Sequence, residues 1–417
     1  MSAGVSDPEQ PVASPVAERP VGLVRGTRDW LPADYARLAA IERQLLDGFA
    51  RAGYQPVRTP VLEFTDLHER KSGAGIVSKL FELAGGGSAS VCLRPELTAS
   101  IVRAYAEAAE CPPLPWRVSS SGPVFRYENA PGAGRLREFT QVGVELIGAP
   151  GPAADAEVIG LADQSLANAG AGDVKIRIGH VGLILEILGH AGLPRSASSA
   201  LVEMLSAAAA DGKGIQTIES ALERLAGWLE SGGEAEAIVP AVSHADEPGV
   251  DRLFRHLVPN VTGRRSGHEI INRLRGKWEL DRTLSQILER VRDQFHGLAE
   301  LRGPAPLVLE RLRQSFAALA PRSIADLGAL VNQLAHHGVN ASRVELDLGF
   351  GRGIGFYSQM IFELVVETAA GPIEVCGGGR YDGLARVLGS DRDDRGVGFA
   401  FGLERLMDTC AGRTVRG

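Results

Sequence analysis

Patterned cysteines and long apolar runs are both missing from this sequence. Its 417 residues include only four cysteines, and none lies in a Cys-x-x-Cys pair or at zinc-ligand spacing from a histidine. The sequence therefore predicts neither a zinc site nor a disulfide framework. No apolar run approaches the roughly 20 residues that span a bilayer, and the N-terminus lacks a basic-then-apolar signal pattern. We expect a cytoplasmic protein without membrane segments.

An excess of positive charge is also missing. Lysine and arginine number 44 against 51 acidic residues, which gives a net charge of -7 and a pI near 5.8. This balance argues against a protein whose main affinity is for a nucleic-acid backbone, although a local basic groove would be compatible with it. The 44% hydrophobic content is sufficient for two or more structural units with a large core.

Residues 119–148 carry the most informative pattern and predict two strands joined by a Gly/Pro-rich turn. In the first strand, alternation places Val124, Arg126 and Glu128 on one face. In the second strand one face is apolar, with Val142, Val144 and Leu146, and the other face is rich in groups that can bind a ligand, namely Arg137, Phe139, Gln141, Gly143 and Glu145. We expect Gly143 to leave room for a ligand. The alternative is an ordinary solvent-exposed hairpin face.

The chain before this hairpin predicts a tail and two helices. Residues 1–20 have little to bury and are expected to be disordered. A helix is expected over 33–52, with Leu38, Ile41, Leu45 and Phe49 at helical spacing. Residues 55–63 are expected to be extended, and a strand over 90–93 is expected to lead into a helix over 99–108.

Glu96 and Thr98 lie where that strand gives way to the second helix. Residues of these two types commonly cap a helix N-terminus. Ligand binding is the other interpretation, and the local sequence does not decide between the two.

The chain after the hairpin predicts a helix over 153–169, a strand over 175–179 and a mainly helical block without a catalytic motif. Strands are expected over 344–348 and 360–368, and a strand followed by a helix over 396–406. Two glycine-rich segments, 349–355 and 377–384, match neither the GxGxxG nor the GxxxxGKS pattern, so we expect no Rossmann or P-loop nucleotide site.

Several separate stretches match one family in order. The chain resembles the catalytic core of histidyl-tRNA synthetase, a class II aminoacyl-tRNA synthetase, over roughly residues 22–407 apart from the helical block. The matching stretches are 93–98 for the amino-acid loop, 122–145 for the second signature motif, 352–363 and 377–384 for two histidine-specific motifs, and 398–406 for the third signature motif.

The resemblance implies a role for individual residues. It implies a histidine site made of Glu96, Thr98 and Gln141 at the amino group, with Glu145, Phe356 and Tyr357 at the imidazole. It implies an ATP site made of Arg126 at the α-phosphate, Glu128 at the adenine, Arg135 at the outer phosphates and Arg405 on the other side of the nucleotide. Arg352 would be the catalytic cation if histidine adenylation is retained.

The sequence also departs from the synthetase pattern. Only 12 residues follow Arg405, so we expect no anticodon-binding domain and no tRNA partner. The family motif Arg-Gly-Leu-Asp-Tyr-Tyr is here Arg-Gly-Ile-Gly-Phe-Tyr over residues 352–357, which removes an acid and a phenol. Leu97 replaces a small residue and Thr140 replaces a histidine.

The truncated shape is similar to the regulatory-subunit family of ATP phosphoribosyltransferase. That resemblance implies binding of L-histidine, assembly with a short-form catalytic subunit, a homodimeric core and no required cofactor or metal. Two alternatives stay open, an active synthetase and a stand-alone amino-acid-adenylating enzyme, and both would use ATP with Mg²⁺. The retained arginines fit these alternatives.

The fold expected from the resemblance is α+β, a class II antiparallel sheet flanked by helices. We expect a tail at 1–20, core segments at 21–180 and 341–417, and a mainly helical insertion at 181–340.

Overall fold

A computed structural model describes most of the chain outside the N-terminal tail and the middle of the helical block. The described residues are 21–72, 76, 78–83, 89–129, 131, 135–191, 290–291, 293–294, 297–298, 300–349, 356–369, 371–392 and 394–410. The expected disordered tail, most of the expected insertion and Arg352 lie outside these ranges. The division into domains therefore stays a prediction.

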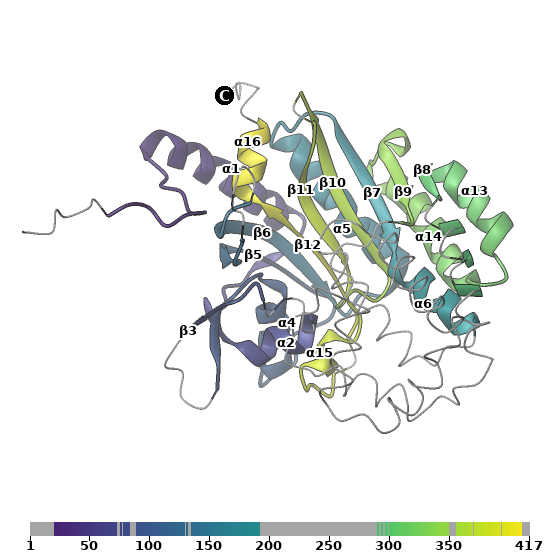
Figure 1. Cartoon of the computed structure of the whole chain (residues 1–417), viewed down its shortest axis with the longest axis horizontal. Coiled ribbons are helices and arrows are strands. Elements are labelled where there is room, and N and C mark those ends of the chain that lie inside the picture. Colours follow the sequence, from purple (N-terminus) through teal and green to yellow (C-terminus); the bar gives the residue numbers. More distant parts are fainter. Residues whose placement is uncertain are drawn as a thin grey trace, which may run out of the picture.

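A large mixed sheet forms the centre of the molecule (Figure 1). Its strands, in spatial order, are β1 (Gln55–Pro56), β5 (Trp116–Phe125), β6 (Glu138–Ile147), β12 (Gly396–Gly402), β11 (Gly371–Arg380), β10 (Met360–Thr368), β7 (Val174–His180), β9 (Val344–Asp347) and β8 (Arg302–Pro304). The β1–β5 and β7–β9 pairs are parallel and the other neighbours are antiparallel. A small antiparallel sheet consists of β2 (Leu62–Phe64), β4 (Val91–Leu93) and β3 (Phe81–Leu83).

Helices flank both sheets. The described ones are α1 (Pro32–Arg51), α2 (Thr65–Ser72), α4 (Thr98–Glu107), α5 (Gly151–Asn168), α6 (Val181–His190), α13 (Ala305–Phe316), α14 (Pro321–Leu334), α15 (Leu384–Val387) and α16 (Leu403–Cys410). The apolar sides of α1, α5 and α14 share one buried core with the apolar face of β6. In Figure 1, α2, α4 and α15 lie together at one end of the sheet, while α13 and α14 lie beside β8 and β9. The α+β class, with a mainly antiparallel sheet flanked by helices, is therefore confirmed.

The amphipathic elements lie close to where the sequence places them. Helix α1 buries the four predicted apolar residues, because their spacing follows the helical repeat. Strand β10 has the predicted bounds, and α4 and α16 begin within a few residues of the expected positions. None of the helices in the described ranges is long and apolar enough to cross a bilayer.

The central hairpin has the predicted two faces, because a strand turns successive side chains to opposite sides. Val142, Val144 and Leu146 of β6 are buried in the core, and Gln141 and Glu145 lie on the opposite face. The segment 55–63, which was expected to be extended, contributes strands to both sheets. Its residues form β1 in the large sheet and the first part of β2 in the small one, separated by a stretch that contains Pro60.

Gly143 lines the pocket, and strand β12 also constrains this position. A Cβ at this position would collide with the backbone carbonyl of Phe399 and lie 2.9 Å from the Cα of Ala400. Both residues belong to β12, the strand that pairs with β6 at this point. A glycine at position 143 therefore permits the close approach of two strands, and the expected room for a ligand stays a prediction.

Candidate functional site

A pocket of about 600 Å³ opens on the polar face of β6. Ten of the eleven predicted site residues line it: Glu96, Thr98, Arg126, Glu128, Arg135, Gln141, Glu145, Phe356, Tyr357 and Arg405. Arg352, the eleventh, lies outside the described residues. Segments that are far apart in the sequence thus converge on one cavity, and the ligand contacts assigned to each residue stay predictions.

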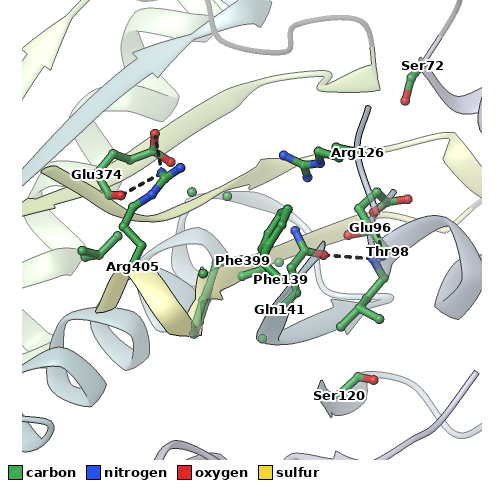
Figure 2. A pocket seen from close by; sticks show the side chains of 18 of the residues that line it. Ser72, Glu96, Thr98, Ser120, Arg126, Phe139, Gln141, Glu374, Phe399 and Arg405 are labelled. Atoms are coloured by element: carbon green, nitrogen blue, oxygen red, sulfur yellow. Dashed lines mark hydrogen bonds and ion pairs between the residues drawn. The ribbon is translucent and has the colours of Figure 1, made fainter. Parts of the chain in front are cut away.

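Figure 2 shows that the pocket has two ends. Glu96, Thr98 and Gln141 lie at one end, the Arg405–Glu374 pair lies at the other, and Phe139 and Phe399 lie between them. We call the first the amino-acid end and the second the nucleotide end, after the roles that the resemblance implies.

Glu96 caps helix α4 at the amino-acid end. Its carboxylate accepts the backbone N–H of Thr98 at 2.7 Å and that of Ala99 at 2.9 Å. The capping interpretation of Glu96 is therefore confirmed, and the residue lines the pocket as well. Capping fixes the carboxylate in place, because two backbone donors hold it.

Lys71 contacts the same carboxylate, and the sequence analysis did not identify it. Its Nζ lies 2.7 Å from Oε2 of Glu96 and 4.0 Å from the centroid of the Phe356 ring. His68, one turn earlier in α2, places Nδ1 3.8 Å from the other oxygen of Glu96. Burial raises the pKa of Glu96, but Lys71, His68 and the backbone donors outweigh burial and lower it to about 2. Burial lowers the pKa of His68, which favours its neutral form.

Glu145 behaves in the opposite way at the same end of the pocket. It is 4% exposed, and burial raises its pKa to about 7 despite hydrogen bonds from Thr98 and Tyr381. The Tyr381 hydroxyl donates to Oε2 of Glu145. Gly398 lies opposite Glu145 on β12, and a side chain there would occupy the position of this carboxylate. Glu145 is therefore a buried acid that changes its charge near neutral pH.

Tyr381 belongs to the segment 377–384, which the resemblance flagged, but it was not among the predicted site residues. Its neighbour Arg380 points into the core, where it pairs with Asp155 and Asp382. The glycines before it allow close packing, since a Cβ on Gly379 would lie 2.8 Å from the Tyr357 ring. The glycine run lies in strand β11, and the absence of side chains there leaves room for neighbouring residues.

Gln141 is held by the backbone of the Glu96 loop. Its side-chain oxygen, Oε1, accepts the N–H of Leu97 at 3.1 Å, so the other terminal atom of the amide is the NH₂ nitrogen, a donor. Figure 2 shows this nitrogen on the side away from Glu96 and Thr98. The rings of Phe356 and Tyr357 pack at a tilt of 36°, with 4.1 Å between their centroids, and complete this end of the pocket.

Arginines and carboxylates alternate at the nucleotide end. Arg405 donates to the backbone oxygen of Glu374 at 3.0 Å and lies 3.7 Å from its carboxylate. Burial, and then the nearby charge of Arg135, lower the pKa of Arg405. Arg126 lies nearer to Glu96 than to Arg405 (Figure 2), since it donates to the Pro95 carbonyl at 3.0 Å, with its guanidinium 5.2 Å from the Phe139 ring. This end can attract an anion, and its cations are partly neutralised by acids of the protein.

Arg28 is a further cation at this end that the sequence analysis did not identify. It lies over the Trp30 ring at 4.2 Å and 3.6 Å from Asp408. Within the described residues, no group of three or more His, Cys, Asp or Glu side chains is arranged to hold a metal ion.

Comparison with known proteins shows that the chain is similar to one family over most of its length. The family model described as histidyl-tRNA synthetase matches residues 26–258 and 249–406. An ATP phosphoribosyltransferase regulatory subunit from Moorella thermoacetica is 33% identical over 389 residues, which cover 93% of this chain and 82% of the relative. A histidine–tRNA ligase from Methanosarcina acetivorans is 32% identical over 391 residues, covering 94% and 76% of the two chains.

Solved structures have the same fold. A protein from Bacillus halodurans C, described as an ATP phosphoribosyltransferase regulatory subunit/histidyl-tRNA synthetase, superposes with a TM-score of 0.62 at 24% identity and covers 95% of this chain and 83% of that one. A histidine–tRNA ligase subunit from Alicyclobacillus acidocaldarius gives 0.56 at 23% identity, with coverage of 95% and 99%. The family match spans well over half of the sequence and includes the pocket, and so the chain belongs to the histidyl-tRNA synthetase family.

Proposed function

We propose that this protein is a regulatory subunit of ATP phosphoribosyltransferase. In this role it assembles with a short-form catalytic subunit, binds L-histidine in the pocket, and is required for the first step of histidine biosynthesis. The observation that carries the proposal is the similarity to the Moorella thermoacetica regulatory subunit, which covers 93% of this chain and 82% of the relative.

The geometry of the amino-acid end supports a binding role. Glu96, Gln141 and Glu145 are already held by hydrogen bonds from Thr98, Leu97 and Tyr381, so little side-chain ordering remains to be done when a ligand binds. A preorganised pocket of this kind suits a sensor of a small polar molecule. No cofactor is required for that role.

An adenylating enzyme is the second candidate, either a synthetase that charges tRNA or a stand-alone enzyme. The observation that favours it is the set of arginines that line the pocket: Arg28, Arg126, Arg135 and Arg405. In such an enzyme these residues would face the phosphates of ATP, and Mg²⁺ would accompany the nucleotide. Against it, Phe356 replaces a phenol of the family motif and lies under Lys71.

The two candidates predict different activities. A regulatory subunit should co-elute with the short-form catalytic chain of the same organism and raise its phosphoribosyl-transfer rate, and it should not charge histidine tRNA. Histidine-dependent pyrophosphate exchange should be weak or absent. Charging of tRNA at rates typical of a synthetase, without any effect on the catalytic chain, would reject the regulatory role.

We also propose a homodimer. Large apolar side chains are exposed on the small sheet, at Leu62, Phe64 and Leu83. A cluster of this kind is typical of an interface with another subunit. Sedimentation at micromolar concentration should give a dimer. A monomer at every concentration, in the absence of the catalytic chain, would count against it.

A further inference from the structure

Arg380, the last residue of β11, is the largest side chain that is buried completely among the described residues. All three nitrogens of its guanidinium group donate hydrogen bonds within the protein. Nε donates to Asp155 at 2.7 Å, Nη2 donates to the Gly151 carbonyl at 3.2 Å, and Nη1 donates to the Ala149 carbonyl and to Asp382, both at 3.1 Å. A buried charge is costly unless it is paired and hydrogen-bonded, and this arrangement meets both conditions.

The contacts of Arg380 fix the backbone on both sides of Tyr381. The oxygen of Asp382 that Arg380 contacts also accepts the N–H of Gly396 at 3.1 Å. The N–H of Tyr381 donates to the Gly396 carbonyl at 2.8 Å, and the tyrosine ring lies over Gly396, where a Cβ would overlap it. The hydroxyl of this anchored tyrosine donates to Oε2 of Glu145 in the pocket.

Ser358 connects the same arginine to the aromatic wall of the pocket. The N–H and the hydroxyl of Ser358 both donate to the Arg380 carbonyl, at 2.7 Å and 3.2 Å, and the hydroxyl oxygen accepts the N–H of Asp382 at 2.9 Å. Ser358 directly follows Phe356 and Tyr357, which line the amino-acid end. One buried arginine is thus linked to two of the segments that form this end of the pocket.

We propose that the buried Arg380–Asp155 pair is a positioning element that holds Tyr381 against Glu145, although neither member of the pair lines the pocket. A buried ion pair often stabilises a core no better than apolar side chains of similar volume, so stability alone does not require charges here. Charge-assisted hydrogen bonds add a fixed geometry. The proposal rests on the proposed function only in taking histidine as the ligand.

Helix α5 supplies a matched control. Asp163, two turns after Asp155, accepts both terminal nitrogens of Arg343 at 2.8 Å and 2.6 Å. The two aspartates are similarly buried, with exposed fractions of 3% for Asp155 and 6% for Asp163, and neither Asp163 nor Arg343 lines the pocket. Asp155→Asn and Asp163→Asn therefore each remove the charge from a buried pair on the same helix, and only the first pair is linked to Tyr381.

The hydrogen bond of Tyr381 can be measured without any ligand. In protein labelled with ¹³C at the tyrosine Cζ, the resonance that disappears in Tyr381→Phe belongs to Tyr381. Asp155→Asn should move this resonance towards that of a tyrosine exposed to water, because the hydroxyl is no longer held against Glu145. Asp163→Asn should leave the resonance at its wild-type position.

Calorimetry with histidine at pH 8 measures the effect on the pocket. The dissociation constant should rise at least fivefold in Asp155→Asn and less than twofold in Asp163→Asn. Urea unfolding should show a comparable loss of stability in both variants, so that a difference in affinity does not follow from stability. If Asp155→Asn does not fold, Asp382→Ala removes a partly exposed acceptor of the same guanidinium and should change the resonance and the affinity in the same direction.

Three results would overturn the proposal. These are an unchanged Tyr381 resonance in Asp155→Asn or its substitute, a change of equal size in Asp163→Asn, and a histidine affinity that Asp155→Asn leaves at the wild-type value. Absence of histidine binding to the wild-type protein, with a resonance that moves only in Asp155→Asn, would reject the proposed histidine binding and leave the positioning of Tyr381 supported. Histidine binding with an unmoved resonance would reject only the positioning role.

Discussion

The two ends of the pocket are built in different ways. At the amino-acid end the Lys71–Glu96 pair is 2.7 Å long, with side chains 2% and 13% exposed. At the nucleotide end the Arg405–Glu374 and Arg28–Asp408 pairs are 3.7 Å and 3.6 Å long, and their side chains are between 24% and 56% exposed. Water and salt screen the second set much more than the first.

This difference predicts how each end responds to change. Buried, fully hydrogen-bonded groups leave an unsatisfied partner when one member is removed, and that loss costs more than the hydrogen bond itself contributes. Solvent can replace a lost partner at the nucleotide end. Single substitutions should therefore have large effects on amino-acid binding and smaller effects on nucleotide binding.

The largest expected effect is that of Glu145→Ala on histidine binding. Removal of one partner from a buried, hydrogen-bonded charged contact typically costs about 2 to 5 kcal/mol. The dissociation constant for histidine should rise by well over tenfold in calorimetry at pH 8, where Glu145 is mostly ionised. A change of less than threefold, with an unaltered circular dichroism spectrum, would mean that Glu145 is not part of the binding site.

The pH dependence of stability should distinguish Glu145 from Glu96, the two acids at the amino-acid end. The pKa of Glu145 is about 7 in the folded protein, above the ordinary value of 4.5 for a glutamate, so the folded state holds this proton more tightly than the unfolded state. The free energy of unfolding should therefore fall as pH rises from 4.5 to 7, by about 3 kcal/mol from this group. Above pH 7 the contribution is constant.

Glu145→Gln removes this contribution and leaves the rest of the titration in place. Urea unfolding at pH 5 and pH 7.5 should show a smaller loss of stability in the variant than in the wild type. Equal losses in the two proteins would show that Glu145 titrates as an ordinary exposed acid. Glu96, whose pKa is lowered to about 2, loses its stabilising charge only below pH 4.5, outside this interval.

A smaller effect is expected from Arg405→Ala at the nucleotide end. ATP affinity should fall by less than tenfold, because Arg28, Arg126 and Arg135 remain and Arg405 is already partly neutralised by Glu374. Histidine affinity should change by less than threefold. Calorimetry with each ligand separately measures both values, and a larger loss for histidine than for ATP would remove the distinction between the two ends.

Periodic patterns predicted individual helices and strands and their buried faces reliably, because these depend on local geometry. The two faces of the hairpin follow from a repeat of two residues, and the buried face of α1 follows from a repeat of 3.6. Ten site residues were found through motif resemblance, and the structure gathers them around one cavity. Their roles stay predictions.

Contacts between distant segments could not be found in this way. Lys71 lies on a short polar helix without an apolar repeat, and only the packing of α2 against α4 brings it to Glu96. A further constraint on Gly143 comes from β12, which pairs with β6 from more than 250 positions further along the chain. Alternation can identify a face, but it cannot identify the strand or side chain that lies against it.

The most direct test of the central claim is a histidine titration of the reconstituted complex with the short-form catalytic subunit. Phosphoribosyl transfer should depend on this protein and fall as histidine is added, and the Glu145→Ala complex, normalised to its own activity without histidine, should need more than ten times as much histidine for half-inhibition. If the catalytic chain has the same activity with and without this protein, or if histidine inhibits the two complexes equally, the regulatory account is contradicted.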